Sequence, residues 1–162
     1  MELALAIGKA LKAQGLMLAT AESCTGGGVA QAVTQIAGSS GWFERGFVTY
    51  SNLSKQQMLD VGGDTLTQHG AVSEAVVREM VAGALVHSAA DVALAVSGIA
   101  GPDGGTLEKP VGTVWFAWGI KQGPTLAQRY QLPGDRQNVR ELSIRIALQG
   151  VINLLASHTA QV

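Results

Sequence analysis

The sequence feature that most constrains the fold is VALAVSGIA, residues 92–100, an almost wholly apolar run that leads into a glycine- and proline-rich loop. A continuous apolar run of this length is typical of a strand buried on both faces. The sequence predicts further strands at residues 16–22, 47–51, 112–120 and 125–132. Helical patterns lie between and around them, at residues 3–11, 29–37, 52–63, 73–90 and 135–155. This alternation predicts an α/β fold, a three-layer αβα sandwich with helices on both faces of a central sheet.

Length and composition favour one globular domain over residues 1–162, because 47% of the residues are hydrophobic and only 14% are charged. The low charge, together with aromatic residues expected at the surface such as Trp42, favours a homodimer. The formal net charge is −1, and no run of Lys and Arg interleaves with aromatic residues. We therefore expect no nucleic-acid partner.

The first fifteen residues have helical periodicity rather than the basic segment and solid apolar core of a secretory signal. No segment is apolar for long enough to cross a bilayer, so we expect a soluble, cytoplasmic domain without membrane contact. One cysteine excludes an internal disulfide, and three dispersed histidines predict no metal site.

Three loop segments follow predicted strands and carry the candidate chemistry: SCTGGG (23–28), YSNLSK (50–55) and SGIAGPDGG (97–105). Ligands of open α/β sheets gather at the carboxyl ends of strands. If the three strands are neighbours, all three segments line one crevice.

The SCTGGG segment allows two interpretations. Its glycines could expose backbone N–H groups to an anion at the start of the next helix, or they could only permit tight packing. A phosphate-binding loop requires a lysine directly after its last glycine, and none is present here. The GxSxG motif of a nucleophile elbow is also absent. Ser23 and Thr25 are candidate nucleophiles that lack a neighbouring base, and Cys24 is expected to be a small buried residue.

The second segment contains Tyr50 and Lys55, which could activate a serine if the lysine is desolvated in the crevice. Spacing alone does not separate this interpretation from an ordinary surface lysine. The third segment is interpreted as a ligand-wrapping loop or, alternatively, as a mobile connection. Arg136 and Arg140 share a helical face and are the better pair of late arginines for binding a phosphate.

The motifs AESCTGG, FVTYSNLSK, GAVSEAVVREMVAGAL, SGIAGPDGG with KPVGTVWFAW, and GDRQNVR follow one another in this order. Together they resemble the CinA C-terminal domain family, and within it the standalone bacterial nicotinamide-nucleotide amidohydrolases. The resemblance implies a compact αβα domain that hydrolyses the carboxamide of nicotinamide mononucleotide to nicotinate mononucleotide and ammonia, in pyridine nucleotide recycling. It implies a small-molecule substrate and no metal or other cofactor.

Carried over to this sequence, the resemblance implies that Ser23 is the nucleophile and that Tyr50 and Lys55 activate it. The backbone N–H groups of Thr25, Gly26 and Gly27 are expected to hold the oxyanion. The expected substrate-binding residues are Asn52, Ser97, Gly98, Arg136 and Arg140. A second hypothesis is an inactive paralogue that acts as a nucleotide-binding or regulatory module.

Overall fold

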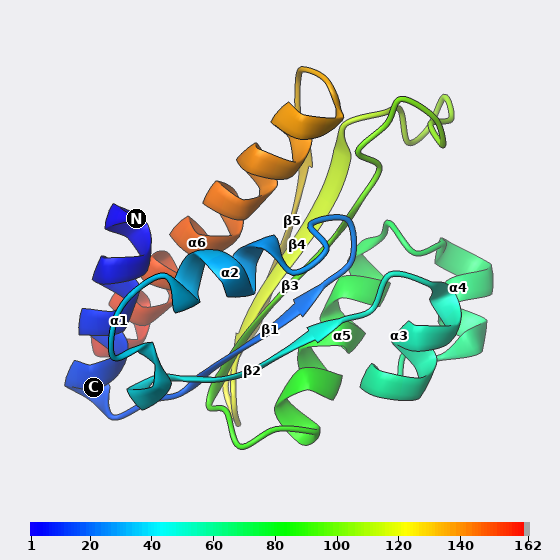
Figure 1. Ribbon diagram of the computed structural model, residues 1–162. Coiled ribbons are helices and arrows are strands. Elements are labelled where there is room, and N and C mark those ends of the chain that lie inside the picture. Colours follow the sequence, from blue (N-terminus) through cyan, green and yellow to red (C-terminus); the bar gives the residue numbers. More distant parts are fainter. Residues whose placement is uncertain (161–162) are drawn as a thin grey trace.

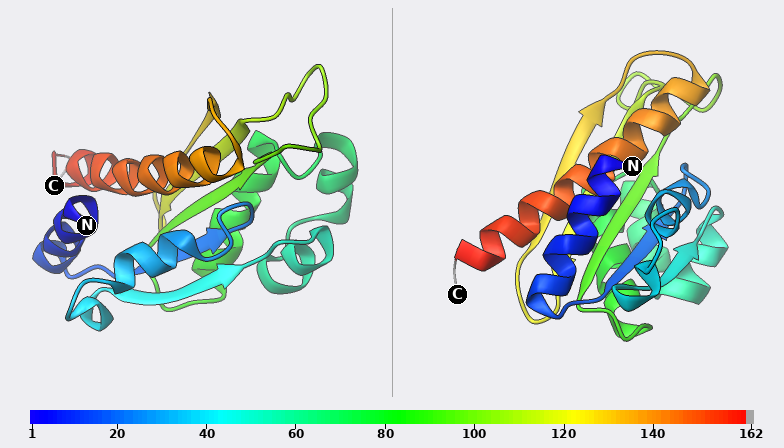
Figure 2. Two further views of the ribbon diagram at one scale, coloured as in Figure 1. Left: turned by 45° about the horizontal axis from the view of Figure 1, so that its top comes forward. Right: turned by 60° about the vertical axis from the view of Figure 1, so that its left-hand side comes forward.

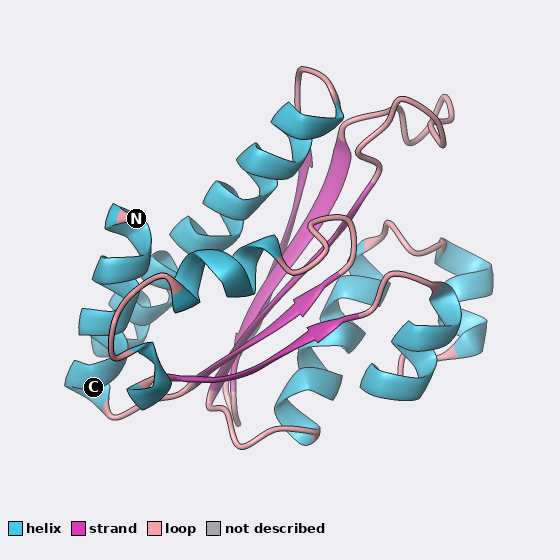
Figure 3. Ribbon diagram, in the orientation of Figure 1, coloured by secondary structure: helices cyan, strands magenta, loops and turns pink. Residues whose placement is uncertain are grey.

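The computed structural model describes residues 1–160 and has a five-stranded mixed sheet at its centre (Figures 1 and 3). The strand order is β2-β1-β3-β4-β5. The first three strands in this order are parallel, and β4 and β5 continue the sheet in antiparallel pairing. The strands are β1 (Leu18–Glu22), β2 (Phe43–Val48), β3 (Val92–Gly98), β4 (Thr113–Ile120) and β5 (Thr125–Gln131).

Helices cover both faces of the sheet, as Figures 1 and 2 show, so the expected three-layer α/β fold is confirmed. One layer contains α1 (Glu2–Gln14), α2 (Gly28–Thr34) and the long α6 (Arg136–Ala160). The other contains α5 (Glu74–Val86), against which α3 (Asn52–Leu59) and α4 (Gly63–His69) pack. The predicted domain boundary at residue 162 includes Gln161 and Val162, which lie outside the described residues.

Two apolar clusters meet across the sheet, and β3 contributes to both because its side chains alternate between the faces. Val92, Leu94 and Val96 pack in the cluster on the α6 side. The intervening alanines of β3 pack in the cluster on the α5 side. The strand is thus buried on both faces, as its unbroken apolar run predicts.

Glycine at position 83 lets α5 approach the end of α3 closely. A Cβ atom at Gly83 would lie 1.9 Å from the backbone oxygen of Leu59. Helix α5 lies within the helical pattern predicted at residues 73–90, and the Ser73 side chain caps it by accepting a hydrogen bond from the Val76 N–H. These contacts hold α3, which carries Lys55, against the body of the domain.

Several predicted boundaries were wrong. Strand β2 begins at Phe43, before the strand predicted at residues 47–51, because its pairing with β1 stabilises a polar edge strand. It ends at Val48, so Tyr50 lies beyond the strand. Helix α4 was not predicted. Helix α3 ends at Leu59, before the predicted end at residue 63, and Asp60 follows it in a left-handed conformation with φ 57°.

Trp42 was predicted to be exposed, and this prediction was wrong. Its side chain is buried, with 1% of its surface accessible. Its indole lies against α1, where a Cβ atom at Gly8 would come within 2.8 Å of the ring. An exposed Trp42 therefore cannot support the homodimer prediction. Among residues 1–160, no helix is both long and apolar enough to span a membrane.

Candidate active site

The three predicted segments meet at the carboxyl ends of β1, β2 and β3, which are parallel neighbours (Figure 1). A pocket of about 290 Å³ lies there. Its wall includes Ser23, Lys55, Ser97, Asp103 and Arg136. The shared crevice predicted from the sequence is therefore present, and the glycine-rich loop after β3 forms one of its walls.

Ser23 follows β1 directly and begins a tight turn. Its N–H donates to the Val96 carbonyl of β3 at 3.0 Å, which continues the strand pairing past the end of β1. Gly26 and Gly27 have φ values of 59° and 99°, which side-chain-bearing residues rarely adopt. A Cβ atom at Gly28 would lie 2.6 Å from Ile144 Cδ1 of α6. The glycines are therefore required by the turn and by close packing.

Glu22 is fully buried and occupies the start of α2. Its carboxylate accepts hydrogen bonds from Thr25 Oγ1 at 2.6 Å, from the Val29 N–H at 2.8 Å and from the Ala30 N–H at 3.0 Å. The first amides of α2 thus bind a carboxylate of the chain itself. The Val29 and Ala30 amides are therefore not available to a ligand anion.

Lys55 lies in α3 and is directed at Ser23. Its Nζ is 2.9 Å from Ser23 Oγ, 2.9 Å from the Thr49 carbonyl oxygen and 3.2 Å from the Tyr50 carbonyl oxygen. The lysine side chain is 1% exposed, so the surface-lysine interpretation was wrong. Burial lowers the pKa of Lys55 below its ordinary value of 10.5, because desolvation disfavours the charged amine.

This arrangement suits proton transfer between the two side chains. A neutral lysine amine keeps two N–H groups, which match the carbonyl oxygens of Thr49 and Tyr50. Its lone pair is then free to accept the proton of the Ser23 hydroxyl. The contact of 2.9 Å lies within the range required of a general base and its nucleophile.

The phenol of Tyr50 lies apart from this pair. Tyr50 is 61% exposed, and its hydroxyl accepts a hydrogen bond from Arg136 Nη2 at 3.1 Å. Arg136 Nη1 donates to the Gly101 carbonyl at 2.8 Å. Tyr50 therefore contacts Lys55 through its backbone carbonyl, while its side chain joins Arg136 in the wall of the pocket.

The two predicted phosphate-binding arginines are placed differently. Arg136 lines the pocket, whereas Arg140 donates from Nε to the Cys24 carbonyl at 3.1 Å and from Nη2 to the Thr25 carbonyl at 3.3 Å. Arg140 thus braces the turn after Ser23 and is not among the described residues that line the pocket.

The expected oxyanion residues Thr25, Gly26 and Gly27 are also not among the described residues of the pocket wall, whereas Cys24 is. The Gly26 N–H donates to the Ser23 carbonyl at 3.0 Å. Burial raises the pKa of the Cys24 thiol to about 11. The thiol is therefore protonated near neutral pH, as expected for a small buried residue.

The remaining expected contacts, Asn52, Ser97 and Gly98, all line the pocket. Ser97 is buried and donates from Oγ to the Ala71 carbonyl at 2.9 Å. Glu22 and Asp103 were not predicted to belong to the site. The signal that could have found Glu22 is an acidic residue at the end of an otherwise mostly apolar strand, directly before Ser23. Asp103 was passed over inside a loop that was itself selected.

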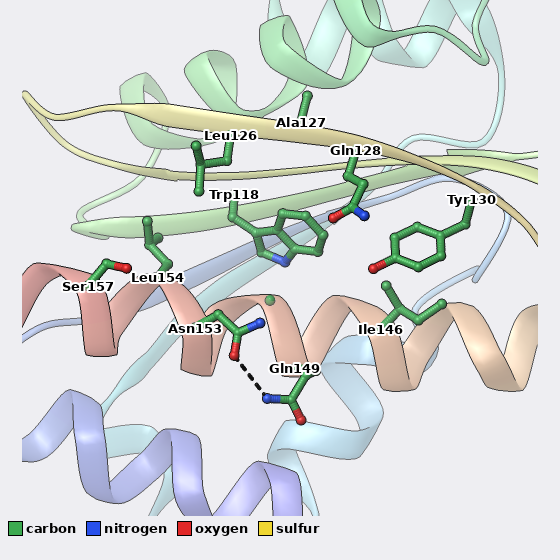
Figure 4. Close-up of a pocket in the computed structure, with 11 residues that line it drawn as sticks. Trp118, Leu126, Ala127, Gln128, Tyr130, Ile146, Gln149, Asn153, Leu154 and Ser157 are labelled. Carbon is green, nitrogen blue, oxygen red and sulfur yellow. Dashed lines mark hydrogen bonds between the residues drawn. The ribbon is translucent and has the colours of Figure 1, made fainter.

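A second cavity, of about 210 Å³, lies between β4, β5 and α6 (Figure 4). Trp118 and Leu126 form part of its wall, with uncharged polar side chains such as Gln149 and Asn153. No Asp, Glu, Lys, Arg or His is among the described residues that line it. It contains no pair of nucleophile and base, so the chemistry is better placed at the Ser23 pocket. Within residues 1–160, no three potential metal ligands gather in one place.

Comparison with known proteins gives consistent matches over nearly the whole chain. The model of the CinA C-terminal domain matches residues 1–155. Nicotinamide-nucleotide amidohydrolase PncC of Escherichia coli strain K12 is 58% identical over 149 residues, which cover 92% of this chain and 90% of that protein. The protein of the same name from Pseudomonas putida is 50% identical over 152 residues, which cover 94% of each.

Solved structures show the same fold. The competence/damage inducible protein CihA from Agrobacterium tumefaciens has a TM-score of 0.92 and 48% sequence identity. The comparison covers 94% of this chain and 93% of that one.

Proposed function

This chain belongs to the CinA C-terminal domain family, and we propose that it hydrolyses the carboxamide of nicotinamide mononucleotide to nicotinate mononucleotide and ammonia. Relatives that match over most of their own length carry the name of this activity. The observation that carries the proposal is the contact of 2.9 Å between Ser23 Oγ and the buried Lys55 Nζ at the pocket. The product, nicotinate mononucleotide, returns to the pyridine nucleotide pool, so the proposed reaction serves the recycling of pyridine nucleotides.

In the proposed reaction, neutral Lys55 accepts the Ser23 hydroxyl proton as Oγ attacks the carboxamide carbon. The tetrahedral intermediate collapses, the C–N bond breaks, and the protonated Lys55 returns the proton to the leaving ammonia. Water then attacks the acyl-enzyme, with Lys55 again as the base, and releases the carboxylate and free Ser23. Each proton that the lysine accepts is returned, so the side chain ends the cycle as it began.

The oxyanion requires backbone donors close to Ser23. Cys24 follows the nucleophile and lines the pocket, which favours its N–H as one donor. Because the Gly26 N–H already donates to the Ser23 carbonyl, and neither Thr25 nor Gly27 is among the described residues of the pocket wall, we propose the Cys24 N–H as the oxyanion donor.

The phosphate of the substrate is proposed to bind Arg136, since its guanidinium lies in the pocket wall. Tyr50 holds this guanidinium through its hydroxyl, which gives the tyrosine a positioning role at the phosphate end. The proposal leaves Arg140 a structural role, because both of its contacts go to backbone carbonyls of the turn.

The test is ammonia release from nicotinamide mononucleotide by the purified protein without added metal, with and without a chelator. Wild type should release ammonia in both conditions, and Ser23→Ala should lose activity by at least about a thousandfold because the nucleophile is gone. Cys24→Ala, the neighbouring control, should retain most activity because its thiol is protonated. A wild type that binds the nucleotide but releases no ammonia would support the regulatory-module hypothesis instead.

A further inference from the structure

The pocket has a buried end and an exposed end. Ser23, 7% exposed, and Lys55 lie at the buried end. Tyr50, Arg136 and Asp103 are exposed and lie in the same pocket wall. A mononucleotide with its carboxamide at Ser23 and its phosphate at Arg136 must place its sugar between these two ends.

The loop that carries Asp103 is anchored beside Arg136. The Ile99 N–H donates to the Thr113 carbonyl at 2.9 Å, and the Gly101 carbonyl accepts from Arg136 Nη1 at 2.8 Å. A Cβ atom at Gly105 would lie 2.7 Å from the backbone nitrogen of Val111, so the loop folds tightly on itself. Asp103, between these contacts, is therefore held at the exposed end of the pocket.

Among the described residues that line the pocket, Asp103 is the only carboxylate. An ionised carboxylate only accepts hydrogen bonds, and its two oxygens match a group that presents two neighbouring donors. It would repel the phosphate beside Arg136, but two adjacent hydroxyl groups of a ribose supply the donors that it requires.

We propose that Asp103 determines sugar specificity by accepting hydrogen bonds from the two hydroxyl groups of the substrate's ribose. This inference rests on the proposed function, because it takes the carboxamide to lie at Ser23. Asp103 then discriminates ribonucleotides from nucleotides without the diol, and it takes no part in the proton transfers.

The test measures binding in the Ser23→Ala protein, so that no turnover interferes. The probes are two carbocyclic analogues of nicotinamide mononucleotide, one with and one without the two ring hydroxyl groups, and Kd is measured by calorimetry. The diol analogue should bind about tenfold or more tightly, the range for hydrogen bonds to a charged group. Adding Asp103→Ala should weaken binding of the diol analogue by a similar factor and leave the other analogue nearly unchanged.

Glu108→Ala is the matched control, because it removes a carboxylate from the same loop at an exposed position outside the described pocket wall. It should leave both Kd values within twofold. Asp103→Asn, which keeps the side-chain shape, should reduce the preference for the diol if the alanine variant folds poorly. Equal weakening of both analogues, or no weakening, would overturn the assignment. Loss of ammonia release by wild type with the diol preference intact would instead overturn only the proposed chemistry.

Discussion

Lys55 shows how the surroundings of one residue set its chemistry. Its Nζ contacts a hydroxyl and two carbonyl oxygens, all of them neutral groups. No salt bridge to Lys55 occurs within residues 1–160. A buried ammonium without a carboxylate is poorly compensated, which favours the neutral amine that a general base requires.

A pH profile tests this role of Lys55. Because the neutral amine is the active form, kcat/KM should rise with pH as Lys55 loses its proton, at a pKa below 10.5. Lys55→Arg should lose activity by at least about a hundredfold at every pH, since a guanidinium stays protonated. Rates of ammonia release between pH 6 and 10 give the profile. A rise in kcat/KM that persists in Lys55→Arg would assign the titration to another group.

At the scale of elements, the turn between β1 and α2 is organised by Glu22. Its carboxylate joins the end of the strand to the first amides of the helix, and Ser23 lies inside the turn that this creates. Arg140 of α6 holds the same turn from its carbonyl side. The nucleophile is therefore positioned by two consecutive elements, β1 and α2, and by α6, which is distant in sequence.

Glu22→Gln should lower the free energy of unfolding by about 1–3 kcal/mol, because a buried, charge-assisted network loses its charge and one acceptor. Urea denaturation followed by circular dichroism measures the change. Glu74→Gln is the matched control, since Glu74 is half exposed and pairs with Arg78 at i,i+4. The control should change stability by about 0.5 kcal/mol or less. Equal effects of the two substitutions would contradict the structural role of Glu22.

At the scale of the whole molecule, the homodimer stays a prediction that rests on the low charge of the chain. Exposed apolar side chains at Leu126 and Val86 are consistent with a covered surface, whereas Trp42 is already buried within one chain. Light scattering coupled to size exclusion should give twice the mass of one chain at micromolar concentration. A mass equal to one chain under these conditions would remove the prediction.

The sequence by itself determined most of the elements, though not α4 or the bounds of β2, and the segments that carry chemistry. The apolar run of β3 and the helical patterns at residues 3–11 and 73–90 are local signals, and each was interpreted correctly. The three loops were selected because polar and glycine residues follow buried strands, which is also a local pattern. Such signals can be interpreted from the sequence alone, because helical periodicity and strand patterns depend on residues only a few positions apart.

Only the tertiary structure decided how these segments meet. The surroundings of Lys55 depend on how α3 packs against the loops that follow β1 and β2, and no spacing within YSNLSK predicts this packing. Three further features each depend on distant partners: the polar strand β2, the indole of Trp42 against Gly8, and the pairing of Tyr50 with Arg136. Desolvation and long-range pairing arise only in the folded chain. The local sequence pattern therefore identifies the candidate residues but does not predict their electrostatic surroundings.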